Sequence, residues 1–228
     1  MTHIHSDQNN MMPVAMEHPM PRTSGIVLHS PFFYDFTVWL AFFGKEQVFR
    51  EKVLDLAHLT IGERVLDVGC GTGTLAIAAK RRLGPIGDVQ GVDASPEMIA
   101  RAQRKSRKAR VELLFRNALA EALPFPDSQF DVVLSSVMLH HLPRKARLLC
   151  AKEIRRVLRP GGRVLAVDFE GMANEKRTFL SHFHRPHGHV TKNDIISLLS
   201  EAGLNTIESG PVGIRDLQYV LATSPCCG

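Results

Sequence analysis

The stretch that decides the fold runs from residue 64 to residue 76 and reads RVLDVGCGTGTLA. It opens with apolar residues of the type found in buried strands. Gly69, Gly71 and Gly73 can then adopt positive φ and let a ligand approach the backbone closely. From Thr74 onward the residues favour a helix. A helix that begins directly after such a turn directs its free N–H groups, and the positive end of its dipole, toward a bound ligand.

The glycine spacing excludes one phosphate-binding motif and departs from another. A P-loop requires a Lys after its last glycine, and no Lys follows Gly73. The dinucleotide fingerprint is G-x-G-x-x-G, whereas the glycines here read G-x-G-x-G. In addition, Asp67 stands two residues before the first glycine. Its carboxylate would repel a pyrophosphate but suits a ligand with an ammonium group, which argues against a nicotinamide-dependent oxidoreductase.

The composition is that of an ordinary globular domain. The chain has 228 residues, of which 44% are hydrophobic and 22% charged, so we expect one domain with a full core. The formal net charge of +5 favours acidic partners only weakly. The four Cys stand at irregular positions that do not form a disulfide framework. Because neither a secretory signal pattern nor an apolar run of about 20 residues is present, we expect a cytoplasmic protein without a membrane span.

The N-terminal part divides into two segments. Residues 1–24 are polar and without periodicity, and we expect a flexible arm. Residues 25–60 are expected to form a helical lid or cap, with one helix over residues 46–59. Within this cap, residues 31–43 contain the single Trp and five of the twelve Phe. This aromatic segment either packs on the sheet as a helix, or covers the ligand site and meets an apolar substrate or a lipid surface.

Strand-like and helix-like segments alternate along the rest of the chain. Helices are predicted to start near residues 74, 96, 144 and 192. Strands are predicted at residues 65–68, 89–93, 111–115, 130–134, 163–167, 205–209 and 218–222. This alternation predicts a Rossmann-like, doubly wound α/β fold with a seven-stranded, mostly parallel sheet and a C-terminal antiparallel hairpin. The basic residues between positions 101 and 110 are interpreted as a solvated helix face.

Polar residues follow the predicted strands at the edge where doubly wound sheets bind their ligands. Asp93 ends the second strand and could accept hydrogen bonds from both hydroxyls of a ribose. Asn117, followed by Ala118, suits an adenine edge because an amide both donates and accepts. Ser135 follows the fourth strand. An adenosine that carries an amino acid instead of a pyrophosphate fits this set, and S-adenosylmethionine is such a molecule.

Residues 64–169 resemble the class I S-adenosylmethionine methyltransferases, in particular the ubiquinone/menaquinone-biosynthesis C-methyltransferase type. Residues 65–76 are similar to motif I of the family, and residues 91–95 are similar to motif II with its ribose-binding carboxylate. Residues 117–125 are similar to the adenine motif, although the family usually has Asp in place of Asn117. The amide oxygen of Asn117 can still accept a hydrogen bond from the amino group of adenine.

The resemblance implies a methyltransferase domain over residues 61–222, followed by a tail at residues 223–228. It also implies S-adenosylmethionine as the cofactor and S-adenosylhomocysteine as its product. Tyr34 would belong to the lid, and Met98 would pack beside the adenine. The cofactor-binding residues expected on this basis are Tyr34, Asp67, Gly69, Cys70, Gly71, Thr72, Gly73, Asp93, Ala94, Met98, Asn117, Ala118 and Ser135.

Two adjacent histidines are the candidate catalytic residues. Methyl transfer depends mainly on holding the nucleophile in line, and a general base helps only where the acceptor must lose a proton. His140 and His141 follow strand four, whose loop faces the methyl group in the class that the chain resembles. The alternative is a structural role at the start of a helix. Residues 135–138 read SSVM, which differs from the Asn/Asp-Pro-Pro-aromatic motif of nucleic-acid amino methyltransferases.

Histidines and cysteines raise two further hypotheses that the sequence favours less. His182, His184, His187 and His189 lie close together, but their spacing matches no standard zinc motif, so no metal is predicted. A substrate-side loop is the preferred interpretation of that segment. The four cysteines raise the idea of an arsenite methyltransferase. Their positions do not reproduce the arrangement of cysteines in that family. Those cysteines are Cys70 in the glycine turn, Cys150 on the apolar face of a helix, and the terminal pair Cys226 and Cys227.

The sequence therefore predicts a methyltransferase that acts on a small, apolar acceptor: a quinone-like carbon, a phenol, an amine or a thiol. The basic helices keep an RNA or protein methyltransferase as an alternative, although a nucleic-acid acceptor is disfavoured. A non-catalytic module with the same fold is a further alternative. Peripheral contact with a membrane is compatible with the aromatic segment. The acceptor atom and the oligomeric state stay open.

Overall fold

The computed structural model describes residues 46–170 and 190–226. Several of the sequence predictions lie outside these residues. They are the flexible arm, the aromatic segment with Tyr34, the cluster from His182 to His189, and Cys227.

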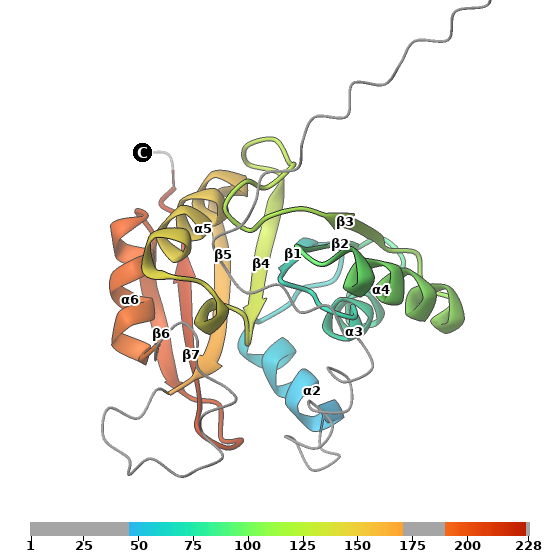
Figure 1. Ribbon diagram of the computed structural model, residues 1–228, viewed down its shortest axis with the longest axis horizontal. Helices are drawn as coiled ribbons and strands as arrows, with labels where there is room; N and C mark the ends of the chain where they lie inside the picture. Colours follow the sequence, from blue (N-terminus) through green and yellow to red (C-terminus); the bar gives the residue numbers. More distant parts are fainter. Residues whose placement is uncertain (1–45, 171–189, 227–228) are drawn as a thin grey trace, which may run out of the picture.

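One seven-stranded sheet organises the described residues, in the order β3-β2-β1-β4-β5-β7-β6 (Figure 1). β1 to β5 are parallel, whereas β7 is antiparallel to both of its neighbours. The strands are β1 (Arg64–Val68), β2 (Asp88–Asp93), β3 (Leu114–Asn117), β4 (Phe130–Ser136), β5 (Leu158–Phe169), β6 (Asn205–Pro211) and β7 (Leu217–Thr223). The predicted fold class is confirmed. The strand order reverses between β1 and β4, which creates the switch point where ligands of such sheets bind.

Helices connect the strands as the alternation predicted. They are α2 (Glu46–Leu56), α3 (Thr74–Leu83), α4 (Pro96–Ala109), α5 (Arg144–Val157) and α6 (Lys192–Glu201), with a short 3₁₀ helix η1 (Leu139–His141). Ser95 caps α4 by accepting the N–H of Met98, and Pro96 stands in its first turn. Thr191 and Asp194 form a capping box at α6.

Three predicted boundaries differ from the structure by three residues or more. The third strand was expected at residues 111–115, but β3 starts at Leu114. The reason is that Val111 donates its N–H to Ser106, which closes the end of α4 instead of pairing with β2. The helix expected over residues 46–59 ends at Leu56. β5 begins at Leu158, earlier than expected, because Phe130 pairs with Leu158 before the register shifts.

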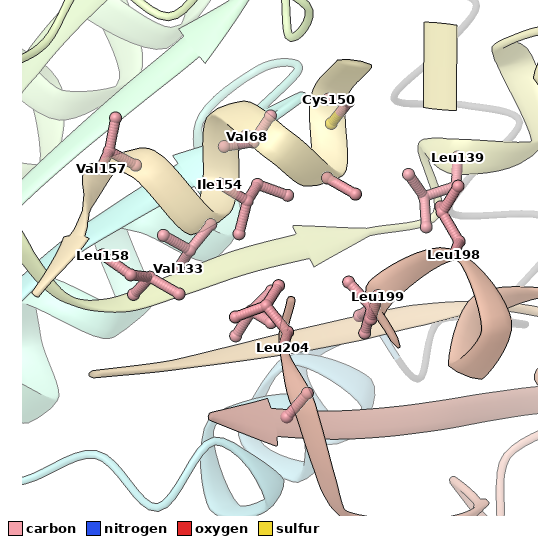
Figure 2. Close-up of a cluster of buried hydrophobic side chains, with 14 of the residues drawn as sticks. Val68, Val133, Leu139, Cys150, Ile154, Val157, Leu158, Leu198, Leu199 and Leu204 are labelled. Carbon is pink, nitrogen blue, oxygen red and sulfur yellow. The ribbon is translucent and has the colours of Figure 1, made fainter. Parts of the chain in front are cut away.

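The two faces of the sheet bury separate apolar clusters. On one face, Val68 of β1 and Val133 of β4 pack against Ile154 of α5 and Leu199 of α6 (Figure 2). On the other face, side chains of α2, α3 and α4 pack against β1, β2 and β4. Because side chains alternate along a strand, the same strands feed both clusters. The sheet is therefore held rigidly from both sides, and its carboxyl edge can present side chains at fixed positions.

The helix α2 belongs to this core. Phe49, Val53 and Leu54 are buried in the cluster that contains α3 and α4. The guanidinium of Arg163 in β5 donates to the carbonyl oxygens of Ala57 and His58, which follow α2. No helix of the described residues is long and apolar enough to cross a membrane.

Candidate active site

The glycine turn after β1 has the left-handed backbone that the sequence predicted. Gly69, Gly71 and Gly73 have φ values of +74°, +52° and +76°. A Cβ atom at Gly69 would lie 2.3 Å from Cγ of Met138, and one at Gly73 would lie 2.7 Å from Cζ of Phe115. Both the conformation and the space therefore require glycine at these two positions.

Asp67 lies beneath this turn with one carboxylate oxygen unused. Its side chain is 2% exposed, and a backbone N–H from Ala76 of α3 reaches it. The other oxygen, Oδ2, has no hydrogen-bond partner among the residues that the structure describes. Burial, together with the nearby charge of Asp93, raises the pKa of Asp67 to about 7. A buried carboxylate with a free oxygen suits an ammonium group, as the sequence suggested.

Asp93, at the end of β2, holds the turn and the start of α4 together. Its Oδ2 accepts the N–H of Gly71 at 2.9 Å, and its Oδ1 accepts the N–H of Ser95 at 2.9 Å. Burial raises the pKa of Asp93, while these two hydrogen bonds act in the opposite direction. Each oxygen keeps a further lone pair, so the carboxylate could still accept from ribose hydroxyls.

The residues expected around adenine surround the same strand ends. Asn117 donates from Nδ2 to the carbonyl oxygen of Asp93 at 2.9 Å, and the N–H of Ala118 reaches that oxygen at 3.1 Å. The amide oxygen of Asn117 remains as the acceptor that an adenine amino group needs. Met98 is 1% exposed in the first turn of α4, and Ala94 is half-buried just before it.

Lys105 is an addition that the sequence analysis missed, since its neighbours were taken as a solvated helix face. Its Nζ donates to Oγ1 of Thr72 at 2.7 Å and to Oγ1 of Thr74 at 3.1 Å. The ammonium group of Lys105 therefore connects α4 to the glycine turn and to the start of α3. A Lys one helical turn before the C-terminal end of an otherwise basic run carries no signal by which sequence alone could single it out.

The buried cysteines have no reactive character. Cys70 lies in the glycine turn, where burial and the charges of Asp67 and Asp93 hold the pKa of its thiol well above the usual range. Cys150 is fully buried on the core face of α5, as expected. Neither thiol is poised as a thiolate, and no group of three metal-ligating side chains occurs within residues 46–170 and 190–226.

Beyond β4 the structure pairs a candidate catalytic residue with a carboxylate. Nδ1 of His140 lies 2.7 Å from Oδ1 of Asp168, and the backbone N–H of His140 donates to Oδ2 of Asp168 at 3.1 Å. The ring of His141 lies at a centroid distance of 3.9 Å from that of His140, at an interplanar angle of 45°. The sequence analysis did not single out Asp168, although its place directly after the predicted strand at residues 163–167 was an available signal.

The candidate site residues within the described part of the chain therefore gather at one edge of the sheet. Asp67 pairs in register with Gly91 and Leu134, and Ser135 pairs with Val68 and Ala166. The hydroxyl of Ser135 is buried and has no partner among the described residues. Tyr34 falls outside the description.

Part of the chain is similar in sequence to known methyltransferases. Residues 65–162 match the family model described as "Methyltransferase domain". The chain is 38% identical to a demethylmenaquinone methyltransferase of Thermus thermophilus over 136 residues, and these residues make up 60% of each protein. It is 34% identical over 138 residues to a ubiquinone/menaquinone biosynthesis C-methyltransferase of Yersinia enterocolitica, covering 60% of this chain and 54% of that protein. The matches thus span little more than half the length of these relatives.

Solved structures show the same fold. A SAM-dependent methyltransferase from Aquifex aeolicus superposes with a TM-score of 0.65 at 24% identity, over 76% of this chain and 88% of that one. The [4+2]-cyclase SpnF superposes with a TM-score of 0.68 at 18% identity, over 92% and 90% of the two chains. Residues 65–162 therefore match a methyltransferase domain in sequence, and the fold is one that a SAM-dependent methyltransferase also has. The sequence is similar to the ubiquinone/menaquinone methyltransferases.

Proposed function

We propose that this protein transfers the methyl group of S-adenosylmethionine to a small, apolar acceptor. The observation that supports the proposal best is the buried oxygen of Asp67 that has no partner within residues 46–170 and 190–226, beside a turn of left-handed glycines. A carboxylate left without a donor in the interior is costly unless a ligand supplies one. The ammonium group of a bound amino acid would do so.

The other strand ends complete the proposed binding site. Asp67 would take the ammonium group, and the free N–H groups at the start of α3 would face the ligand's carboxylate. Asp93 would bind the ribose, while Asn117 and Ala118 would contact the adenine beside Met98. When bound, S-adenosylmethionine supplies a methyl group on a sulfonium, which is a strong electrophile. The protein's part is then to position the acceptor and exclude water.

An apolar acceptor with a quinone-like ring is the class we propose. Two of the relatives are named for demethylmenaquinone and ubiquinone/menaquinone methylation. The match to the methyltransferase domain, over residues 65–162, covers β2, β3 and β4 and almost all of β1. Half-buried Val137 and Met138 follow β4, and Phe169 lies edge-on to His140 at a centroid distance of 5.9 Å. These side chains give the surroundings of His140 an apolar character suited to such a ring.

Calorimetric titration with S-adenosylhomocysteine tests the cofactor. The wild type should bind it, and Asp93→Ala should weaken binding by about tenfold or more, because the charge-assisted ribose contact is lost. Asp88→Ala is the matched control, since Asp88 lies at the opposite end of the same strand. Binding of NADH in place of S-adenosylhomocysteine would contradict the proposal.

Transfer of labelled methyl groups tests the acceptor class. Protein, methyl-labelled S-adenosylmethionine and a reduced, prenylated 1,4-naphthoquinone are incubated together, and label is then extracted into an organic solvent. Total RNA and a mixed protein fraction serve as comparison acceptors. Label that appears only in RNA or protein would overturn the small-acceptor proposal. Binding without any transfer would favour a non-catalytic module.

A further inference from the structure

We propose that Asp168 is a positioning residue that fixes the imidazole of His140, so that its Nε2 accepts a proton from a hydroxyl on the acceptor. The proposal rests on the methyltransferase function and narrows the acceptor to a molecule with an acidic hydroxyl, such as a phenol or an enol. The resulting anion would attack the methyl group through its oxygen or its conjugated ring carbon.

The contacts of Asp168 determine which nitrogen of His140 carries hydrogen. Oδ1 of Asp168 accepts the N–H of Phe169 at 2.8 Å and lies 2.7 Å from Nδ1 of His140. Oδ2 accepts the backbone N–H of His140 at 3.1 Å. An ionised carboxylate can only accept hydrogen bonds, so the hydrogen of the neutral imidazole belongs on Nδ1. Nε2, on the opposite side of the ring, is left as an acceptor.

Burial and a second anchor make this arrangement rigid. Asp168 is fully buried, whereas the side chain of His140 is 27% exposed and so can be reached by an acceptor. Arg147 of α5 donates from Nε to the carbonyl oxygen of Leu139 at 2.8 Å, which fixes the short helix η1. The cation of Arg147 also interacts electrostatically with Asp168. A carboxylate held by three donors and a nearby cation is a fixed support for the ring.

The position of His140 relative to the glycine turn supports a role in the reaction. Met138, two residues earlier, lies so close to Gly69 that any side chain at Gly69 would collide with it. The short helix η1, which contains His140, therefore begins directly after Met138, the residue that packs on the glycine turn. The buried carboxylate opposite Nδ1 and the partly exposed side chain of His140 give the arrangement that a proton acceptor needs.

The proposed step moves one proton and one methyl group. The hydroxyl proton of the acceptor moves to Nε2 of His140, and the electron pair of the acceptor forms the new bond to the methyl carbon. The bond between that carbon and sulfur breaks, and sulfur keeps its electron pair as the neutral thioether of S-adenosylhomocysteine. Where a ring carbon is the attacking atom, the hydrogen on that carbon is then lost and the oxygen is protonated again, so that the ring returns to its hydroxyl form. The imidazolium that forms is stabilised by Asp168 until the proton passes to solvent.

Nitrogen NMR of the protein with labelled histidine tests the positioning directly. The spectrum is recorded with saturating S-adenosylhomocysteine between pH 7 and 8, and the His140 signals are assigned by comparison with His140→Asn. We expect Nδ1 to carry hydrogen and Nε2 to be bare. A ring with hydrogen on Nε2, either as the other neutral tautomer or as imidazolium, would overturn the proposal, because such a nitrogen cannot accept a proton.

Variants separate positioning from structure. Asp168→Asn should let the ring populate both neutral tautomers and lower kcat for the reduced naphthoquinone by about 10²-fold, with S-adenosylhomocysteine affinity within about twofold of wild type. Asp194→Asn is the control, because Asp194 also interacts with Arg147 and does not contact His140 in the described part of the chain. It should change neither quantity.

A second variant keeps the test decisive if Asp168→Asn fails to fold. His140→Asn retains an N–H that can donate to Asp168 but lacks the proton acceptor, so it should lower kcat by a similar factor. Unchanged kcat in His140→Asn would overturn the inference while leaving the proposed function intact. The converse result, a bare Nε2 in a protein that transfers no methyl group, would count against the proposed function alone.

Discussion

Two buried aspartates on neighbouring strands of this protein have opposite surroundings. Asp131 is the second residue of β4, at the amino edge of the sheet, and Asp67 lies near the carboxyl end of β1. Asp131 accepts the backbone N–H of Arg64 at 2.6 Å and pairs with Nε of Arg159 at 2.7 Å. Asp67 keeps an oxygen without a partner among the described residues. The first carboxylate joins chain segments, whereas the second is the one that we propose binds a ligand, at a cost in stability.

The largest expected effect is on ligand binding through Asp67. Asp67→Asn should weaken S-adenosylhomocysteine binding by about 10²-fold, because loss of one partner of a buried charged pair costs about 2–5 kcal/mol. Calorimetric titration measures the change. Asp131→Asn serves as the control and should bind as wild type does. Equal affinity of the wild type and Asp67→Asn would contradict a role of Asp67 in ligand binding.

The next effect concerns stability at the amino edge. Asp131→Asn should lower the free energy of unfolding by about 2 kcal/mol, since hydrogen bonds to a charged group contribute about 1.5–3 kcal/mol. Arg64 and Arg159 are about half exposed, so water can solvate them once the carboxylate is gone. Urea denaturation of the ligand-free protein provides the measurement. A change below about 0.5 kcal/mol would show that the paired carboxylate contributes little.

Ligand binding through Asp67 should depend on pH. With a pKa of about 7, Asp67 is mostly protonated at pH 6 and mostly ionised at pH 8 in the free protein. The ammonium group needs the ionised form, so affinity for S-adenosylhomocysteine should rise about tenfold between these two pH values. In Asp67→Asn the rise should disappear. Affinity that falls as pH rises would contradict the assignment.

The smallest expected effect is a gain in stability when the free carboxylate is removed. The pKa of Asp67 is raised on folding, so the folded state binds the extra proton and wild-type stability falls as pH increases from about 4 to about 7. At 1.36 kcal/mol per pKa unit the penalty above pH 7 is about 4 kcal/mol. Asp67→Asn removes this penalty, but its buried amide then has an N–H without a partner, and that new cost offsets most of the gain in stability. We expect this variant to be about 1 kcal/mol more stable at pH 8, with Tm a few degrees higher, and about equal to or below wild type at pH 4.

Much of the local structure could be predicted from the sequence. The strand–turn–helix unit, the seven strands, Ser95 as a helix cap and the capping box of Thr191 all agree with the structure. Each depends on residues within a few positions of one another. The predicted start of the third strand was wrong. The N–H of Val111 donates to the carbonyl oxygen of Ser106 at the end of α4 and does not pair with β2.

The site could be predicted only in part. Asp67, Asp93 and Asn117 were proposed from the sequence because they stand at or near the ends of strands, which places them at one edge of a parallel sheet. Lys105 and Asp168 were missed, because their contacts join residues 28 to 33 positions apart. Their importance depends on how helices and strands pack against each other.

The sequence by itself determined the order of strands and helices, the left-handed glycine turn and the carboxylates that end β1 and β2, since these follow from local side-chain chemistry and hydrophobic alternation. Only the tertiary structure decided which carboxylate is satisfied and which is left open. Asp67 and Asp131 look alike in the sequence, each next to apolar strand residues. Their difference comes from distant groups: Arg159 reaches Asp131, while no described donor reaches Oδ2 of Asp67.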